Sequence, residues 1–288
     1  MSLTIEHVNY VYMAGGPYET QALYDVNLSI GDGEFVALIG HTGSGKSTLV
    51  QHLNGLLAPT SGRVLVDGQD LAEKGTDRRA VRFRVGLVFQ YPENQLFEET
   101  VEKDIAFGPR NLGLGEEEIA RRVKDAMRRV NLSEEVAGRS VFELSGGQMR
   151  RVAIAGVLAM EPEVLVLDEP CAGLDPHGRE EILGVIRRLH SESGTTIVMV
   201  SHSMDDVANL AERVVVMDHG RIVMDGAPAE IFSKGEELRA MGLDVPQAVE
   251  LAERLREHGI AVPENAYRLE EVAQAILAAA GKGEAHAQ

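Results

Sequence analysis

Two glycine-rich segments and one acidic pair are the residues of this sequence whose types and spacing could do chemistry. The first segment follows the apolar run 35–39 and has the spacing Gly-x4-Gly-Lys-Ser of a phosphate-binding loop. In such a loop, backbone N–H groups and the start of the next helix bind phosphate oxygens. We expect Lys46 to reach the β- and γ-phosphates of a nucleotide and the Ser47 hydroxyl to bind Mg²⁺. The candidate phosphate-binding residues are Gly40, His41, Thr42, Gly43, Ser44, Gly45, Lys46, Ser47 and Thr48.

The acidic pair Asp168-Glu169 ends a second apolar run, 164–167. We expect this run to be a buried strand that brings both carboxylates to the phosphate loop. Asp168 would then hold Mg²⁺, directly or through water, and Glu169 would polarise the attacking water as a general base. An acidic turn at the end of a strand is common by itself, but the upstream loop favours the catalytic interpretation.

The second glycine-rich segment, 144–148, reads Leu-Ser-Gly-Gly-Gln and precedes a helix expected to begin near Met149. Ser145 is a good N-cap residue, and donors at a helix N-terminus can also bind a γ-phosphate, so the two roles are compatible. The candidate nucleotide-binding residues here are Ser145, Gly146, Gly147 and Gln148.

Taken together, these three segments resemble the ATP-binding subunits of ABC transporters, over roughly residues 3–232. The resemblance implies ATP and Mg²⁺ as cofactors, ATP hydrolysis coupled to transport, and sites shared between two chains. It implies that Gln90 binds Mg²⁺ or the attacking water and that His202 hydrogen-bonds the γ-phosphate. Asp175 would belong to the turn that couples the two sites.

Two of these assignments have alternatives. Tyr12 stands where the adenine-stacking aromatic residue is expected, since aromatic faces suit base stacking, and Tyr10 is its rival. The His41 side chain, although inside the loop, could equally have an ordinary solvated or hydrogen-bonded role.

A narrower resemblance is carried by Phe-Gln-Tyr-Pro-Glu-Asn-Gln-Leu-Phe-Glu-Glu-Thr-Val at 89–101 and Asp-Ile-Ala-Phe-Gly-Pro at 104–109. These segments are similar to the energy-coupling factor (ECF) transporter ATPases, the CbiO/EcfA group. This implies a second ABC ATPase subunit, identical or related, an EcfT-like transmembrane subunit, and membrane S subunits that capture vitamins or metal ions. The chain would be peripheral at the cytoplasmic face of the membrane. Residues 91–97 would pass motion to the membrane partner, with Leu96 and Phe97 either as an apolar surface for that partner or as part of the subdomain's own core.

The resemblance also implies the fold class: α/β, a P-loop NTPase cassette. A RecA-like mixed or parallel sheet would carry an N-terminal β-subdomain and an inserted helical subdomain at 91–160, followed by a small C-terminal helical domain. We place the cassette at 1–232 and a C-terminal dimerisation region at 233–288. The residue patterns predict strands at 35–39, 63–68, 85–89, 163–167, 196–200 and 213–217. They predict helices at 47–57, 116–130, 177–191, 204–211, 246–257 and 269–280, with disorder at 281–288.

Composition narrows the function further. The net charge of −17 disfavours non-specific nucleic-acid binding, which depends on Lys and Arg. No apolar run is long enough to span a membrane, and the first residues lack the pattern of a signal peptide.

The sequence departs from the family pattern at two places. The single cysteine, Cys171, stands where Thr or Ser is commoner, and Ser201-His202-Ser203 replaces the frequent Thr-His pattern. We interpret Cys171 as a small core residue rather than a redox sensor.

Two functional alternatives to an ECF transporter ATPase stay open at this point. An ordinary ABC importer would use the same motifs. A soluble ABC-type machine for DNA repair or translation usually needs two cassettes, a long coiled-coil insertion or zinc-binding cysteines.

The helix at 246–257 carries an apolar stripe (Val249, Leu251, Ala252 and Leu255) that would pack on a partner chain or on its own cassette.

Overall fold

The central sheet is built from strands that are buried on both faces. In β3 (Phe35–Ile39), β7 (Val164–Asp168) and β8 (Thr196–Val200), every residue is buried. The odd-numbered residues of β3 pack into one core cluster and the valine and leucine between them into another. This alternation follows from the two-residue period of a strand, and burial on both faces is typical of a parallel sheet covered by helices.

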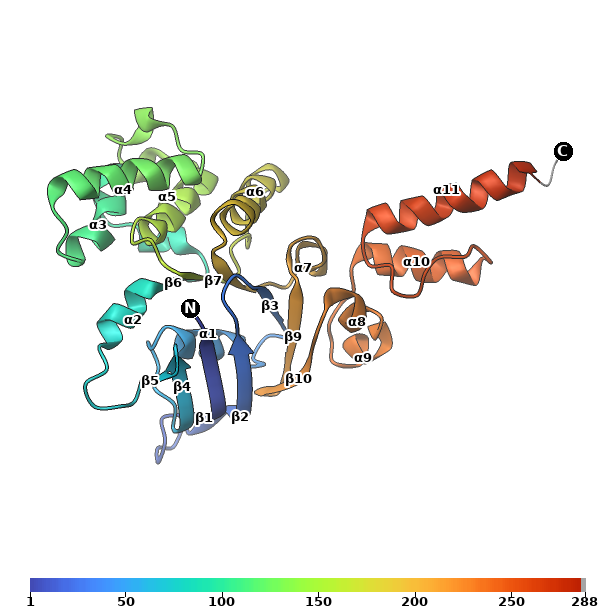
Figure 1. The fold of residues 1–288 in the computed structure, drawn as a ribbon, viewed down its shortest axis with the longest axis horizontal. Helices are drawn as coiled ribbons and strands as arrows, with labels where there is room; N and C mark the ends of the chain where they lie inside the picture. The colour runs from blue at the N-terminus through green and yellow to red at the C-terminus, as the bar shows by residue number, and fades with distance from the viewer. Residues whose placement is uncertain (286–288) are drawn as a thin grey trace.

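The computed structural model describes residues 1–285, and Figure 1 shows their arrangement. The central sheet has the strand order β10-β9-β3-β8-β7-β6. The other strands are β6 (Val85–Val88), β9 (Arg213–Asp218) and β10 (Arg221–Gly226). All neighbours pair in parallel except β9 and β10. Because parallel strands end at one edge, the segments after β3, β6, β7 and β8 meet there.

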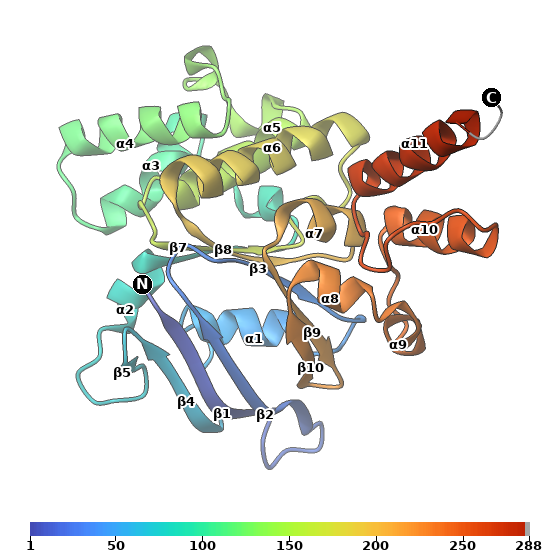
Figure 2. The ribbon, with the colours of Figure 1, turned by 45° about the vertical axis from the view of Figure 1, so that its right-hand side comes forward.

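A second, antiparallel sheet covers the helix that follows the phosphate loop. It has the order β2-β1-β4-β5 and consists of β1 (Leu3–Tyr12), β2 (Thr20–Ile30), β4 (Ser61–Val66) and β5 (Gln69–Asp70). Helix α1 (Lys46–Leu53) lies between the two sheets (Figure 2) and shares one apolar cluster with both. This burial fixes the helix whose N-terminus carries the phosphate loop.

The inserted helical subdomain forms a layer on the other side of the central sheet (Figure 1). After α2 (Arg78–Arg84) and β6, it comprises the 3₁₀ turns η1 (Pro92–Gln95), η2 (Glu134–Val136) and η3 (Val141–Glu143) and the helices α3 (Val101–Asn111), α4 (Glu116–Arg129) and α5 (Gly146–Leu158). These elements lie within the range predicted for the subdomain.

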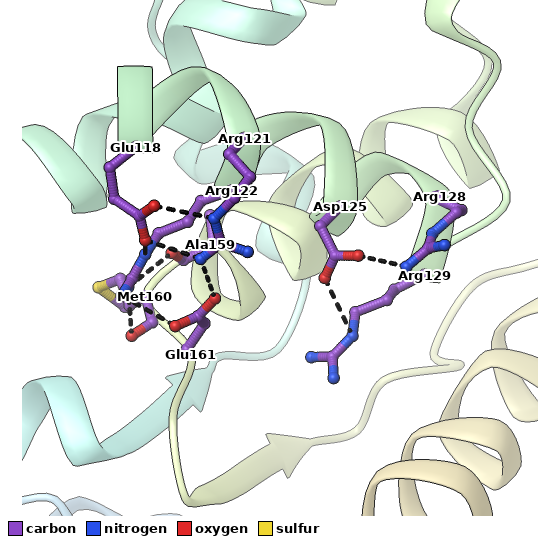
Figure 3. A network of polar contacts seen from close by, with 9 residues as sticks. All are labelled: Glu118, Arg121, Arg122, Asp125, Arg128, Arg129, Ala159, Met160 and Glu161. Atoms are coloured by element: carbon purple, nitrogen blue, oxygen red, sulfur yellow. Dashed lines mark hydrogen bonds and ion pairs between the residues drawn. The ribbon is translucent and has the colours of Figure 1, made fainter. Parts of the chain in front are cut away.

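An ion-pair network ties α4 to the segment that leads into β7 (Figure 3). Arg122 pairs with Glu161 at 2.8 Å and with Glu118 one turn earlier on its own helix at 2.8 Å. Arg121 joins the same two carboxylates. A single exposed ion pair contributes little, but four pairs sharing two carboxylates hold the first half of α4 against the end of α5.

The C-terminal helices begin as part of the cassette and end as an extension of it. They are α8 (Pro228–Phe232), α9 (Gly235–Ala240), α10 (Gln247–Glu257) and α11 (Leu269–Ala285), after α6 (Pro176–Ser193) and α7 (Met204–Leu210). Leu238, Val245 and Val249 belong to the main core, so the region packs on its own cassette across the boundary predicted at 232. Helices α10 and α11 share a small cluster of their own and extend away at one end (Figure 1).

The structure differs from the sequence prediction mainly at helix ends. Helix α1 stops at Leu53 rather than near 57, because Gly55 adopts a left-handed φ of 67° that ends the helix. The helix after the second glycine-rich segment starts at Gly146, not near Met149. In α10, Leu251 is exposed and the buried residues are Ala248, Val249 and Ala252. Helix α11 continues to Ala285, where disorder was expected from 281; residues 286–288 lie outside the described residues.

No helix among the described residues is long and apolar enough to cross a membrane.

Candidate nucleotide site

Two glycines allow the chain to turn tightly between β3 and α1. Gly40 has a φ of 157°, and a Cβ there would lie 2.3 Å from the carbonyl oxygen of Met217. Gly45 has a left-handed φ of 102°, and a Cβ would lie 2.8 Å from the carbonyl oxygen of Ala22. Any larger residue would push the loop away from β9 or β2. The loop therefore keeps its backbone N–H groups at the N-terminus of α1, as phosphate binding requires.

The Lys46 side chain is fixed inside the phosphate loop by hydrogen bonds. Its Nζ donates to the carbonyl oxygens of Gly40 at 2.6 Å and His41 at 3.0 Å. Burial lowers the pKa of Lys46, while the nearby carboxylates of Glu169 and Asp168 act in the opposite direction. Within the part of the chain that the structure describes, the hydrogen-bond partners of the ammonium are thus uncharged: these two carbonyls and, at 3.4 Å, the Ser44 hydroxyl. An anionic ligand in the loop would offer it a charged partner and a stronger, charge-assisted hydrogen bond.

Asp168 and Ser47 face each other at the end of β7. Burial raises the pKa of Asp168, and a hydrogen bond from the Ser47 hydroxyl together with the charge of Lys46 partly offsets that effect. A hydroxyl and a carboxylate oxygen side by side are hard oxygen donors, the type that Mg²⁺ prefers. The donor set therefore fits Mg²⁺.

Glu169 occupies an unusual backbone position directly after β7. Its φ is 53°, in the left-handed region that costs a non-glycine residue energy and often marks functional sites. Burial raises its pKa to about 7. Its Oε1 lies 3.1 Å from His202 Nε2, yet that buried oxygen lacks a hydrogen bond of good geometry within the described residues. A buried carboxylate oxygen with spare acceptor capacity and a pKa near 7 suits a general base.

These side chains open onto one cavity of about 520 Å³. Gln90, after β6, and His202, after β8, both line it, as predicted from the sequence. Burial and the charge of Lys46 lower the pKa of His202, which favours the neutral imidazole. Of the predicted residues, the wall includes Tyr12, Thr42, Gly43, Gly45, Lys46, Ser47, Thr48, Gln90, Asp168, Glu169 and His202.

At the cavity mouth the structure separates the two tyrosine candidates. Tyr12 is 38% exposed and its hydroxyl lies 3.0 Å from Thr48 Oγ1. Tyr10 packs edge-on against Tyr12 and the His52 ring and does not line the cavity. Tyr12 therefore presents the aromatic surface beside the phosphate loop.

Comparisons with known proteins agree with this geometry. Residues 23–172 match the family model described as ABC transporter. The chain belongs to the ABC transporter family. It is 58% identical over 278 residues to the energy-coupling factor transporter ATP-binding protein EcfA2 of Clostridium perfringens, covering 96% of this chain and 98% of that protein.

Solved structures of ABC proteins share the fold. The structure of cbiO1 from Clostridium perfringens, described as part of the ABC transporter complex cbiONQ, superposes with a TM-score of 0.74 at 40% identity and covers 89% of this chain and 96% of that one. The ATP-binding cassette MJ0796, a dimer bound to ADP and Pi in a post-hydrolysis state, has a TM-score of 0.69 at 29% identity and covers 78% of this chain and 98% of that one.

The Leu-Ser-Gly-Gly-Gln signature of this ABC cassette lies apart from the cavity. None of residues 144–148 lines the cavity wall. Ser145 caps α5 by accepting from the Gln148 backbone N–H at 3.3 Å, and the Gln148 side chain accepts from the Ser145 N–H at 3.0 Å. Ser145 and Gly146 are exposed. Asp175 is likewise exposed and caps α6 by accepting from the Gly178 N–H at 2.7 Å. Both segments are thus well-formed helix starts that open to the surface.

Three residues of the predicted loop lie behind the cavity rather than on its wall. Gly40 and the fully buried Ser44 form the inner side of the turn. The His41 ring turns away, with Nε2 3.0 Å from Asp218 and Nδ1 2.8 Å from the Thr42 carbonyl oxygen. The His41 side chain therefore has an ordinary hydrogen-bonded role in this structure, which was one of its two alternatives.

Part of the cavity wall was not predicted from the sequence. It comes from β2 (Thr20, Gln21, Ala22 and Tyr24), from the end of β8 (Val200) and from the β9–β10 turn (His219 and Gly220). Gly220 could have been noticed in the sequence as a glycine that the fold requires, because a Cβ there would lie 2.5 Å from the Ala22 carbonyl oxygen. The sequence showed a glycine in a turn but not which strand approached it.

Cys171 packs against the main core, as expected. Burial raises the pKa of its thiol to about 12. Since the thiolate is the reactive form, burial disfavours a role for this cysteine as a nucleophile or redox sensor.

Proposed function

We propose that this chain is the ATP-hydrolysing subunit of an ECF-type transporter and acts on a separate transmembrane subunit. The observation that carries the proposal is the convergence of Lys46, Asp168 and Glu169 on one cavity at the N-terminus of α1. The relatives named as energy-coupling factor proteins support the transporter type. The chain would be peripheral, at the cytoplasmic face of the membrane, and its substrate-binding membrane S subunits would select a vitamin or a metal ion.

For hydrolysis, the residues of this chain have distinct roles. Lys46 exchanges its carbonyl partners for phosphate oxygens, and Tyr12 stacks on the base. Glu169 takes the proton of the attacking water, while Gln90 and His202 position that water and the γ-phosphate. Ser47, Asp168 and Gln90 would hold Mg²⁺, which supplies charge stabilisation at the phosphates.

A second ATPase chain, identical or related, completes each site. The signature residues Ser145, Gly146, Gly147 and Gln148 lie at a helix N-terminus, where the first two are exposed, and none of them lines the nucleotide cavity of its own chain. In a head-to-tail pair they would bind the γ-phosphate held by the partner's phosphate loop, with Asp175 coupling the two sites. A helix N-terminus favours negative charge, so the signature is suited to this role.

An apolar groove on the helical subdomain is the proposed contact for an EcfT-like subunit. It has a volume of about 520 Å³, and its lining includes Phe83, Leu96, Phe107, Val157 and Met160. Phe97 stacks edge-on against Phe107 at 4.8 Å, and both rings are exposed, by 57% and 44%. Leu96 is only 8% exposed and belongs to the subdomain core. The aromatic rim and apolar floor suit a short amphipathic helix.

Arg150 links this groove to the hydrolytic site. Its guanidinium is 1% exposed and makes a bidentate pair with Glu93 in η1. It also donates to the carbonyl oxygens of Pro170 at 3.1 Å and Ala172 at 2.6 Å, directly after Glu169. One buried cation thus connects the segment after Gln90, the signature helix α5 and the catalytic turn. Movement at any of the three must be accommodated by the other two.

The test is co-purification of the chain with its membrane partner from mild detergent, comparing Phe107→Asp with Val223→Asp. Both residues are 44% exposed, but Val223 lies on β10 and outside the groove. We expect Phe107→Asp to lose the membrane subunit while ATP hydrolysis by the ATPase pair continues, and Val223→Asp to retain both. Retention by both variants would exclude the groove. A membrane subunit of an ordinary ABC importer in the purified complex would exclude the ECF assignment.

A further inference from the structure

Two imidazoles and a carboxylate converge beside the nucleotide cavity, where the phosphate loop meets the β9–β10 turn. His41 Nε2 lies 3.0 Å from Asp218 Oδ1, and His219 Nε2 lies 3.8 Å from the same oxygen. One ligand atom from each residue lies within 4.8 Å of the other two. We propose that these three side chains bind a divalent transition-metal ion such as Zn²⁺, Co²⁺ or Ni²⁺. The hydrolytic mechanism uses none of the three side chains.

The hydrogen-bonded orientation of the His41 ring is also compatible with a metal ligand. Its Nδ1 lies 2.8 Å from the carbonyl oxygen of Thr42. A carbonyl can only accept, so Nδ1 carries the proton and, in the neutral ring, Nε2 directs its lone pair at Asp218. Two acceptors 3.0 Å apart need a cation or a proton between them. A backbone carbonyl behind the ring is the usual outer-shell partner that fixes the tautomer of a metal-bound histidine.

The distances match the coordination of these ions. Two ligand atoms that are each about 2.0–2.1 Å from a tetrahedral Zn²⁺ lie roughly 3.3 Å apart. The separation of 3.0 Å between His41 and Asp218 already fits, and the 3.8 Å between His219 and Asp218 requires only a small rotation. His219 is free to make it, because its side chain is 83% exposed. Two imidazoles with one carboxylate select Zn²⁺, Co²⁺ or Ni²⁺ over Mg²⁺, which prefers oxygen ligands.

The backbone around the site is already fixed. The Gly220 N–H donates to the Ser44 carbonyl oxygen at 3.0 Å, and the Tyr24 N–H donates to the Gly220 carbonyl oxygen at 2.9 Å. His219 and Gly220 both have positive φ, 43° and 76°, in a two-residue hairpin turn. Such turns favour Asn or Asp followed by Gly, and His also adopts positive φ more readily than most residues, so the turn can present an imidazole at 219 without rearrangement. A bound ion would order one side chain and fasten the loop to this turn.

The experiment titrates Zn²⁺ by calorimetry, and Co²⁺ by visible absorption, into full-length protein free of nucleotide and Mg²⁺. We expect one ion per chain at this site. His219→Asn keeps the preferred turn chemistry and removes one ligand. Because loss of an outer-shell partner alone typically costs about 10- to 100-fold in metal affinity, loss of this ligand should weaken binding at least about 10-fold and change the Co²⁺ spectrum.

Two control variants locate the ion. His177 is 88% exposed and lies 4.0 Å from the Glu181 carboxylate, so His177→Asn removes a comparable imidazole from elsewhere and should bind like the wild type. His202→Ala removes the imidazole beside Glu169 and should also leave binding unchanged. The proposal is overturned if the wild type binds no ion, if His219→Asn binds like the wild type, or if binding is lost with His202→Ala instead. None of these outcomes depends on transport or on ATP hydrolysis.

Discussion

The phosphate loop and the signature segment are chemically alike, but only one of them has a completed site. Both are glycine-rich and both begin a helix, α1 in one case and α5 in the other. Around the loop, β2, the ends of β7 and β8, and the β9–β10 turn enclose a cavity with a buried lysine, the buried Asp168 and the partly buried Glu169. Around the signature, Ser145 and Gly146 are exposed and face no such wall.

This difference shows that a helix N-terminus with glycine amides is not sufficient for a site. At the loop, burial raises the pKa values of Asp168 and Glu169 and lowers that of Lys46, which makes each group responsive to a ligand. At the signature, the side chains of Ser145 and Gln148 each accept from the other's backbone N–H. We therefore infer that the signature acquires its function only when a second chain brings its phosphate loop to it.

The largest effect on ATP hydrolysis should come from Glu169, which lies in the cavity beside the phosphate loop. Replacing Glu169 with Gln keeps the shape and removes the base, so turnover should fall by about 10²- to 10⁴-fold. ATP binding should persist and an ATP-bound dimer should accumulate. Steady-state phosphate release and size-exclusion chromatography with ATP measure the two effects. Turnover at the wild-type rate would remove Glu169 from the role of base.

The next comparison sets Lys46→Ala against Ser145→Arg. Lys46 serves its own chain, and loss of a charge-assisted hydrogen bond of about 1.5–3 kcal/mol should weaken ATP binding by roughly 10- to 100-fold. Ser145 serves the partner, so Ser145→Arg should leave ATP binding to the isolated chain unchanged and prevent the ATP-bound dimer. Equilibrium binding of a fluorescent ATP analogue separates the two. Weakened binding in the Ser145→Arg monomer would place the signature in its own chain's site.

The pH dependence of the hydrolytic reaction should report Glu169. Its folded pKa of about 7 lies above the usual value for Glu, and only the carboxylate can act as the base. Activity should therefore be present above pH 7 and fall about tenfold per pH unit below it. The measurement is kcat/KM against pH, which reports the free enzyme. If kcat/KM instead fell only near the ordinary pKa of Glu, the idea that burial raises the pKa of Glu169 would be contradicted.

The smallest effect is expected at the C-terminal helices, which we propose as a dimer contact when the ATP sites are open. Leu277 on α11 is 71% exposed and apolar. Leu277→Glu should lower the fraction of nucleotide-free dimer by a few-fold, since an exposed apolar contact of about 1 kcal/mol corresponds to that change. Analytical ultracentrifugation measures it, with Val223→Glu on β10, where Val223 is 44% exposed, as a comparison away from α11 and the signature segment. Unchanged association of Leu277→Glu would remove α11 from the contact.

The sequence allowed part of the cavity wall to be predicted, because several of its residues stand where a strand ends. Asp168, Glu169, Gln90 and His202 all stand at the ends of apolar runs, and parallel strands bring such ends together. The contributions of β2 and the β9–β10 turn could not be predicted, because they depend on which loops approach each other in space. The choice between the two alternatives for Leu96 could not be made from the sequence for a similar reason. The exposure of this residue depends on the packing of α3 and α5 around it and not on its local sequence.

The central claim, that each ATP site is shared between two chains, is tested most directly by placing two lesions in a mixed dimer. Two differently tagged copies, both carrying Glu169→Gln, are assembled with Lys46→Ala and Ser145→Arg either in separate copies or in one copy. The measurement is the number of ATP molecules retained per dimer after rapid gel filtration. With the lesions in separate copies, a shared arrangement leaves one intact site and predicts one retained ATP; with both in one copy it predicts none. One retained ATP with both lesions in one copy, and none with the lesions separated, would contradict the account.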